Sequence, residues 1–361
     1  MATVGHQDGL FDAPGGNALG ELLERVNALQ PEGRAPGTRE DYAYWSDRYA
    51  AFCAQHDQSP LPATSELLAA WTLTLIDQEL SPNTIRLALA AVSARHVDLH
   101  LPKPDRTAAA NLISGYTRKK KRSGWHERQV DPLRIVHLKT IFDTMDGRPS
   151  HLRDRAMMLL NVFAFLRGEE LTCLSIEDVT LSEDHQWLTL LLCWSKTDQA
   201  GDGVIVDVPR AFETWLDPVK VTLDWIAWLD RQGVQEGPLF RQMNKNGREL
   251  YVHPRAKAPW PRQGGMSREA YTQILQRWTD RAGVPGDFAS HSGRRGAATE
   301  ASRRGATPSE IADAGRWKPG STVLWRYIEG LNRNDRRRNH PMARVLRPAD
   351  GPAGDSAVEE P

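Results

Sequence analysis

The sequence predicts a mainly α-helical protein with an all-helical first domain and a mainly helical second domain that contains a small antiparallel β-sheet. The chain has 361 residues, which is more than one compact core usually covers. Apolar residues recur at helical spacing in the first third, and no strand pattern occurs before residue 125. Two later segments, WLTLLLC at 187–193 and VIVDV at 204–208, have the composition of β-strands.

The first domain, residues 36–118, is expected to consist of helices. A flexible acidic arm, residues 1–35, precedes it and holds at most one short helix, near 19–29. The first domain helix opens at Thr38 and carries an apolar stripe on one face, formed by Tyr42, Trp45, Tyr49 and Phe52. Further helices are predicted at 65–78, 81–97 and 107–119, and the second of these starts with a Ser-Pro pair typical of a helix N-terminus.

A polar, basic segment at 119–132 is predicted to link the two domains. The second domain follows at 133–347. Its helices are expected at 133–145, 152–165, 218–231, 267–282, 293–304, 309–314 and 321–331. The segment Trp194–Gly203 is expected to form the hairpin loop between the two strands, and residues 348–361 a disordered acidic tail.

The formal net charge of zero is the sum of unlike parts. Residues 1–35 carry two bases and five acids, and residues 348–361 carry four acids and no base. Subtracting −3 and −4 from zero leaves +7 on residues 36–347. A basic body of this kind is compatible with a polyanionic partner, because binding depends on local charge.

Several function classes have no support in the sequence. The three cysteines are too few and too widely spaced for a disulfide framework, and no segment approaches the roughly 20 apolar residues of a membrane span. We therefore expect a cytoplasmic protein without a membrane partner. HExxH, GxxxxGK[ST] and GxGxxG motifs are absent and the histidines are scattered, so no metal, ATP or dinucleotide cofactor is expected.

Two clusters could place arginine beside an anion. In LRGEEL, Arg167 precedes Glu170 by three residues; this is either a helix start with acids in its first turn, or an arginine oriented by a carboxylate. In HSGRR, His291 and Arg294 lie on the same side of one helical turn and could converge on one phosphate. A capping histidine followed by surface arginines is the alternative interpretation of the second cluster.

Two further clusters are ambiguous by themselves. Lys196 lies in the predicted hairpin loop, where most lysines are simply solvated. Trp317 is followed by Tyr327 on the next predicted helix, and both could belong to the core. A phenol has a pKa near 10, so Tyr327 would act as a nucleophile only in an electropositive pocket with a proton acceptor.

Taken in this order, the four clusters resemble the pattern of the tyrosine recombinase (phage integrase) family, with the closest resemblance to its Cre recombinase subgroup. The resemblance runs from about residue 38 to 346 and includes PLFRQMNKNG and HSGRRGAATEASRRGATPSEIADAGRW. It implies that the first domain is a SAM-like core-binding, DNA-binding domain. It also implies that the second is a catalytic domain whose segment 338–347 docks as a helix into a neighbouring protomer.

The resemblance also implies the role of each site residue. Arg167 and Arg294 would clamp the oxygens of the scissile phosphate. His291 would assist proton transfer, and Trp317 would donate its indole N–H to the phosphate.

Three more roles follow from the same resemblance. Tyr327 would attack phosphorus and form a 3′-phosphotyrosyl link without metal or ATP, Lys196 would protonate the departing 5′-hydroxyl, and Glu170 would be a supporting residue. One departure from the family pattern is the spacing of Trp317 and Tyr327, which are ten residues apart instead of the usual nine. The turn at Pro319-Gly320 can absorb the extra residue.

As a member of this family, the protein would recombine double-stranded DNA at inverted-repeat core sites, as a homotetramer on two sites, and would be nucleoid-associated. Candidate DNA contacts are Lys119, Lys120, Lys121, Arg122, Arg241, Lys245, Arg336 and Arg337. A solvated charged surface is the alternative for these side chains. A catalytically silent DNA-binding relative, a telomere resolvase and a type IB topoisomerase are the alternative functions.

Overall fold

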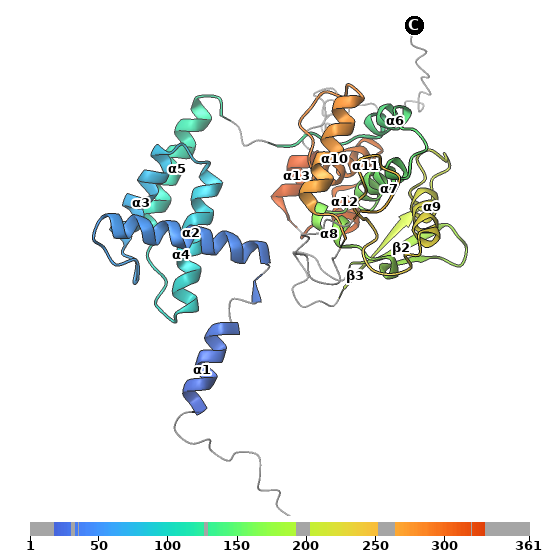
Figure 1. Cartoon of the computed structure of the whole chain (residues 1–361). Helices are drawn as coiled ribbons and strands as arrows, with labels where there is room; N and C mark the ends of the chain where they lie inside the picture. The colour runs from blue at the N-terminus through green and yellow to red at the C-terminus, as the bar shows by residue number, and fades with distance from the viewer. Residues whose placement is uncertain are drawn as a thin grey trace, which may run out of the picture. The chain divides into compact units, whose positions relative to one another are not determined.

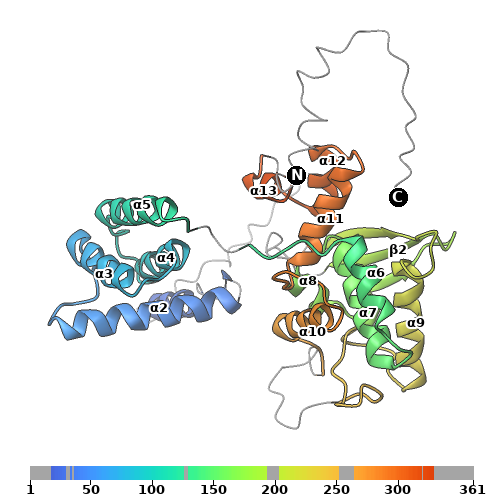
Figure 2. The ribbon, with the colours of Figure 1, turned by 90° about the horizontal axis from the view of Figure 1, so that it is seen from above.

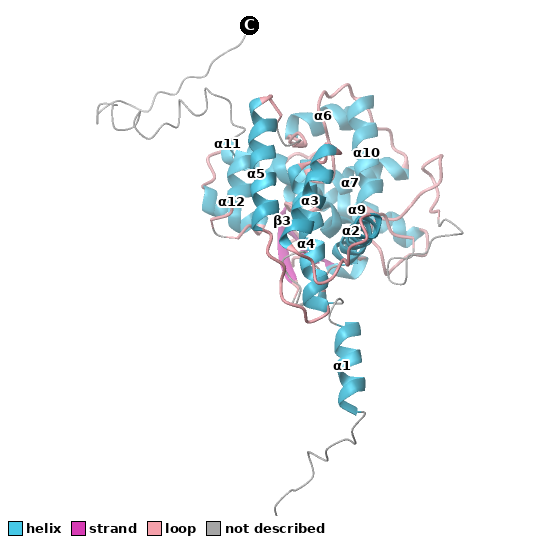
Figure 3. Ribbon diagram, turned by 90° about the vertical axis from the view of Figure 1, so that its left-hand side faces the viewer, coloured by secondary structure: helices cyan, strands magenta, loops and turns pink. Residues whose placement is uncertain are grey.

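The computed structural model describes residues 18–29, 33–34, 36–125, 129–192, 203–251, 264–318 and 320–328. The chain divides into two compact units, Met1–Arg128 and Gln129–Pro361. Helices dominate the described residues, and the strands belong to one small antiparallel sheet (Figure 3), so the predicted fold class is confirmed. Among these residues, no helix is long and apolar enough to cross a membrane.

The first unit is helical throughout its described part (Figure 1). Its helices are α1 (Ala18–Leu29), α2 (Pro36–Gln55), α3 (Ser65–Asp77), α4 (Pro82–Asp98) and α5 (Thr107–Arg122). Helix α2 packs against α4, and α3 packs against α5. The predicted stripe on α2 faces this core: Trp45 and Tyr49 are buried, and Tyr42 and Phe52 pack against the same cluster.

The helix caps explain why α4 starts where the sequence predicts. The Ser81 hydroxyl accepts a hydrogen bond from the Thr84 N–H at 3.1 Å, and Pro82 occupies the first helical position. Such a cap stabilises a helix by about 1 kcal/mol. The end of the predicted arm is also fixed to this unit, because Arg34 forms an ion pair with Asp98 at 2.5 Å.

Helix α5 corrects the start of the predicted linker. The sequence-based boundary places the linker at 119–132, but the helix continues through Arg122. Lysine and arginine are good helix formers, and positive charges in the last turn are stabilised by the helix dipole. The basic run 119–122 therefore belongs to α5, and the connection between the two units starts after it.

The second unit contains the sheet and the remaining helices. In chain order these are α6 (Ile135–Asp143), α7 (Pro149–Phe163), α8 (Gly168–Cys173), η2 (Ile176–Asp178), β1 (Val179–Leu181), β2 (Trp187–Leu192), β3 (Val204–Pro209), α9 (Pro218–Arg231), α10 (Arg268–Arg281), α11 (Ser292–Arg303), α12 (Pro308–Gly315) and α13 (Thr322–Ile328). Helix α7 packs against α8, α9 and α11 (Figure 2), and its residues 156–162 are all buried. It is therefore the scaffold on which the C-terminal helices are placed.

The sheet has the order β1-β2-β3, and both pairings are antiparallel. Strands β2 and β3 match the predicted strands, and Leu190 pairs with Val206. Leu188, Leu190 and Leu192 of β2 are buried on one face, as the period of two requires. Strand β1 was not predicted, because three residues are too few to show a strand pattern.

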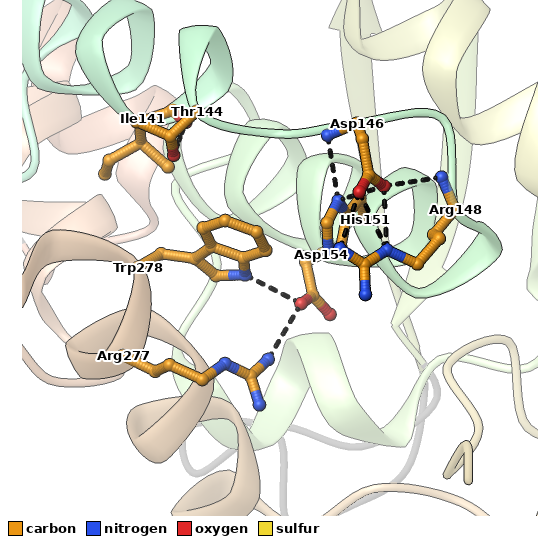
Figure 4. Close-up of polar contacts among 8 residues, drawn as sticks. All are labelled: Ile141, Thr144, Asp146, Arg148, His151, Asp154, Arg277 and Trp278. Atoms are coloured by element: carbon orange, nitrogen blue, oxygen red, sulfur yellow. Dashed lines mark hydrogen bonds and ion pairs between the residues drawn. The ribbon is translucent and has the colours of Figure 1, made fainter. Parts of the chain in front are cut away.

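A buried carboxylate joins α7 to α10 (Figure 4). The side chain of Asp154 accepts hydrogen bonds from Arg153 at 2.9 and 2.6 Å, from the Trp278 indole at 2.8 Å and from Arg277 at 3.2 Å. The ring of His151 packs edge-on against Trp278 at 4.7 Å. These contacts fix the N-terminal part of α7, while its C-terminal end leads into the segment that carries Arg167.

Candidate active site

Arg167 lies at the N-terminal cap of α8, where Glu170 binds both its backbone N–H and its guanidinium. The Arg167 N–H donates to Glu170 Oε2 at 2.8 Å, and its guanidinium forms an ion pair with Glu170 Oε1. Burial alone would raise the pKa of Glu170, but Arg316, the Arg167 N–H and the Arg167 guanidinium hold it below its ordinary value. The carboxylate is therefore ionised at neutral pH, and both interpretations of this cluster apply, since Glu170 caps the helix and also orients the arginine.

Arg294 lies in the first turn of α11 and is 2% exposed. Its two terminal nitrogens donate to the carbonyl oxygens of Phe165 and Gly315, and its guanidinium lies over the Trp317 ring, 4.1 Å from the centroid. Burial, followed by the charge of Arg167, lowers the pKa of Arg294 to about 9. The low pKa shows that burial and the neighbouring positive charge disfavour the charged form of Arg294, and an anion bound beside it would relieve both effects.

His291 immediately precedes α11 and keeps an exposed edge. Burial of the rest of its ring, followed by the charges of Arg294, Arg268 and Arg167, lowers the pKa of this imidazole. His291 is therefore neutral at pH 7 and can accept a proton there.

Trp317 and Tyr327 lie next to each other. Their ring centroids are 5.8 Å apart, and the rings meet at 69°. A Cβ at Gly315 would lie within 2 Å of the Trp317 ring, so only glycine fits there. The Thr299 hydroxyl donates to the Tyr327 carbonyl at 3.2 Å and ties α13 to α11. The extra residue between Trp317 and Tyr327 therefore does not separate the two rings.

The structure brings Arg316 into this site, although the sequence analysis did not select it. Its guanidinium donates to Glu170 Oε2 at 2.8 Å, on the side away from the Arg167 ion pair. A signal was present in the sequence, since Arg316 directly precedes Trp317.

Asn161 is a second residue that the sequence analysis missed. It is fully buried in α7, accepts a hydrogen bond from the Tyr271 hydroxyl at 3.0 Å, and donates to the Leu166 and Ser290 carbonyls at 2.7 and 3.4 Å. Leu166 and Ser290 immediately precede Arg167 and His291, so one amide connects the two arginine-bearing segments. A single polar residue inside the apolar run MMLLNVF was the signal for this role.

Replacing Asn161 with leucine should lower the free energy of unfolding by about 2–3 kcal/mol, because two buried carbonyls and one buried hydroxyl lose their partner. Tyr271→Phe, the matched control, removes only one of these hydrogen bonds and should cost about 1 kcal/mol. Urea unfolding measures both values. Equal costs for the two variants would show that the amide donors of Asn161 do not hold the two segments.

The remaining predicted residues are Lys196 and the candidate DNA contacts. Of these, Lys196, Arg336 and Arg337 lie outside the described residues. Lys119, Lys121 and Arg122 are exposed on α5, whereas Lys120 donates to the Glu79 carbonyl at 3.2 Å and lies over the Tyr116 and Trp125 rings.

Arg241 and Lys245 lie in the segment between α9 and α10. The guanidinium of Arg241 donates to the carbonyls of Pro238 and Glu236 at 3.0 and 2.6 Å, so it stabilises its own loop. Lys245 is exposed at the rim of an open pocket of about 380 Å³ whose other basic lining residues are Arg148, His151, Arg153, Arg277 and Arg281.

The site therefore contains three guanidinium groups, an imidazole, an indole, a phenol and one carboxylate: Arg167 and Arg316 bind Glu170, and Arg294 lies over Trp317, which packs against Tyr327. Planar guanidinium groups match the oxygens of a phosphate, and the excess of positive charge favours an anion in which negative charge grows during reaction. Within the part of the chain that the structure describes, no group of three or more His, Cys, Asp or Glu side chains could hold a metal ion.

Comparisons with known proteins agree with this assignment. The phage integrase family model matches residues 133–333. The integrase/recombinase xerD homolog of Selenomonas ruminantium is 28% identical over 307 residues, covering 83% of each chain. The recombinase cre of Escherichia phage P1 is 24% identical over 292 residues, covering 79% of this chain and 81% of that protein. The comparisons therefore do not single out the Cre subgroup.

Solved structures share the fold. A lambda integrase dimer bound to a COC′ core site matches with a TM-score of 0.53 and 16% identity, over 87% of this chain and 96% of that one. The Tn1549 transposon integrase in complex with a circular intermediate DNA matches with a TM-score of 0.55 and 14% identity, over 89% and 99%. Since the family model covers more than half of the chain, the protein belongs to the phage integrase family and is a tyrosine-type site-specific DNA recombinase.

Proposed function

We propose that the protein cleaves and rejoins duplex DNA at inverted-repeat core sites through a 3′-phosphotyrosyl intermediate at Tyr327 and a Holliday junction, without metal or ATP. The observation that carries the proposal is the convergence of Arg167, Arg294 and Trp317 next to Tyr327, from four different elements. This cluster supplies positive charge for a phosphate beside a phenol that could attack it.

The proposed cleavage step exchanges one phosphodiester for another. The Tyr327 oxygen bonds to phosphorus while the bond from phosphorus to the 5′-oxygen breaks. His291, neutral at pH 7, accepts the phenolic proton, and Lys196 gives a proton to the departing 5′-oxygen. Attack by the 5′-hydroxyl of another strand reverses these steps and releases Tyr327, so no nucleotide is consumed.

The basic body of the chain, +7 over residues 36–347, supports double-stranded DNA as the partner. We propose that residues 36–118 form a DNA-binding domain and that the exposed Lys119, Lys121 and Arg122 contact phosphates. We further propose that four protomers act on two sites, that segment 338–347 docks into a neighbour, and that the protein works on DNA in the cytoplasm. Salt titration of DNA binding with Lys→Ala variants would measure the phosphate contacts.

The proposal is tested with a duplex selected for binding from a random pool and then nicked close to the cleavage point, so that the cleaved strand diffuses away. The wild-type protein should form a covalent DNA adduct that survives SDS. Tight binding without an adduct would instead identify a silent DNA-binding relative. Relaxation of a supercoiled plasmid that lacks the selected site would identify a type IB topoisomerase.

The role of Lys196 has its own test. Lys196→Ala should slow cleavage by about 10²–10⁴-fold, the usual contribution of a positioned acid. A substrate with sulfur at the 5′-bridging position has a leaving group that needs no proton, so it should restore the rate of this variant to near that of the wild type. Lack of rescue by sulfur would argue against the acid role, and Lys220→Ala, a variant of an exposed lysine on α9, controls for charge.

A further inference from the structure

Arg316 adopts a backbone conformation that side chains other than glycine rarely take. It caps the C-terminal end of α12 with φ 57° and ψ 43°, in the left-handed region. Glycine is favoured at this position of a helix because a Cβ crowds the neighbouring carbonyl there. The chain nevertheless places a long arginine here and buries its side chain to 14% exposure, so the guanidinium must make interactions that offset both costs.

These interactions centre on Glu170, which is 146 residues away in the chain. The Nη2 of Arg316 donates to Glu170 Oε2 at 2.8 Å, and weaker contacts of 3.4 Å reach the Ala164 and Phe165 carbonyls. The Arg167 guanidinium binds the other oxygen, Oε1. The carboxylate is thus held between two guanidinium groups, and its plane is fixed from both sides.

The charge balance of the cluster depends on this arrangement. With Arg167 alone, the carboxylate would cancel the charge of the arginine that it orients. Arg316 supplies a second positive charge to the same carboxylate, and three guanidinium groups against one carboxylate leave two net positive charges. A phosphodiester carries one negative charge and gains more in the transition state, so this excess is of the required sign and size.

We propose that Arg316 is a positioning residue for DNA cleavage: it holds Glu170 so that the carboxylate orients Arg167 without cancelling the charge that Arg167 presents to the scissile phosphate. The proposal rests on the function proposed above.

The test compares Arg316→Gly, Glu170→Gln and the double variant. Glycine suits the left-handed backbone, so the substitution removes the guanidinium without new strain. We expect Arg316→Gly to cleave the nicked duplex about 10–100-fold more slowly in a single turnover, as when a supporting residue is lost. DNA affinity should stay within about threefold, and the melting temperature within a few degrees of the wild type. In the Glu170→Gln background, Arg316→Gly should slow cleavage by less than about a further threefold, because the two residues act as one unit.

The pH profile separates positioning from a structural role. Glu170 must be ionised to hold Arg167, and Arg316 is the first of the charges that lower the pKa of this carboxylate. Without Arg316 this pKa rises, so the acid limb of the cleavage rate should move to higher pH. Arg316→Lys keeps the charge and should restore part of the shift. The control is His185→Gly, which changes an exposed residue that also has a left-handed backbone, with φ 59°. It should change neither the cleavage rate nor the position of its acid limb.

A cleavage rate of Arg316→Gly within about twofold of the wild type would overturn the proposal. Additive losses in the double variant, or a lower rate with an unmoved acid limb, would overturn it as well. Absence of a covalent adduct with the wild-type protein would instead contradict the proposed function.

Discussion

Replacing Tyr327 with phenylalanine is expected to abolish the covalent DNA adduct. The substitution removes only the hydroxyl, so the ring still packs against Trp317 and the helix α13 keeps its contact with α11. Loss of a nucleophile commonly costs 10⁴-fold or more in rate, because the remaining groups of the site have nothing to activate. An adduct assay with the nicked duplex measures this loss.

The control for this experiment is Tyr251→Phe, which changes an exposed tyrosine in the same unit. This variant should form the adduct at the wild-type rate. Both variants should bind the duplex with wild-type affinity and show wild-type melting temperatures. An adduct of normal yield in Tyr327→Phe would show that another residue attacks the phosphate and would remove Tyr327 from the mechanism.

Replacing Arg294 with alanine should have the second-largest effect. Its guanidinium is fixed by two backbone carbonyls and by the Trp317 ring, so it needs no reorganisation to stabilise charge that develops on a phosphate. We expect cleavage to slow by about 10³-fold or more, with a smaller loss of DNA affinity, because the interaction strengthens in the transition state. Single-turnover cleavage and equilibrium binding, measured side by side, give the two values.

Arg294→Lys distinguishes geometry from charge. Lysine keeps a positive charge but cannot bind the Phe165 and Gly315 carbonyls while also presenting a planar donor pair. It should therefore recover only a small part of the lost rate. Arg304→Ala, at the exposed C-terminal end of the same helix, should cleave like the wild type. Full recovery with lysine would mean that charge alone, without the fixed guanidinium, accounts for the effect.

Local signals in the sequence were sufficient for most of the fold. The Ser-Pro pair at 81–82 marks the start of α4, and the alternation in β2 marks its buried face. Where prediction failed, the local signal was weak or pointed to another structure. The basic run 119–122 looks like a linker by charge, yet lysines continue a helix readily. Strand β1 exists only because it pairs with β2, which no local pattern encodes.

The residues of the candidate site also fall into those that the sequence pattern could select and those that it missed. Arg167, Glu170, His291, Arg294, Trp317 and Tyr327 could be selected because their types and spacing form a pattern along the chain. The structure places all six around one cluster.

Arg316 and Asn161 each had only a weak local signal and were not selected, because their roles depend on contacts with residues far away in the sequence. Glu170 and Ser290 are 146 and 129 residues from them, respectively. Such contacts exist only after α7, α8, α11 and α12 have packed together.

The most direct test of the account is to identify the covalent bond itself. The adduct is digested with trypsin and a nuclease, and the nucleotide-bearing peptide is sequenced by mass spectrometry. We expect one modified peptide, Tyr327–Arg333 (YIEGLNR), with the nucleotide attached to the phenolic oxygen through its 3′-phosphate. A nucleotide on any other residue, or attachment through a 5′-phosphate, would contradict it.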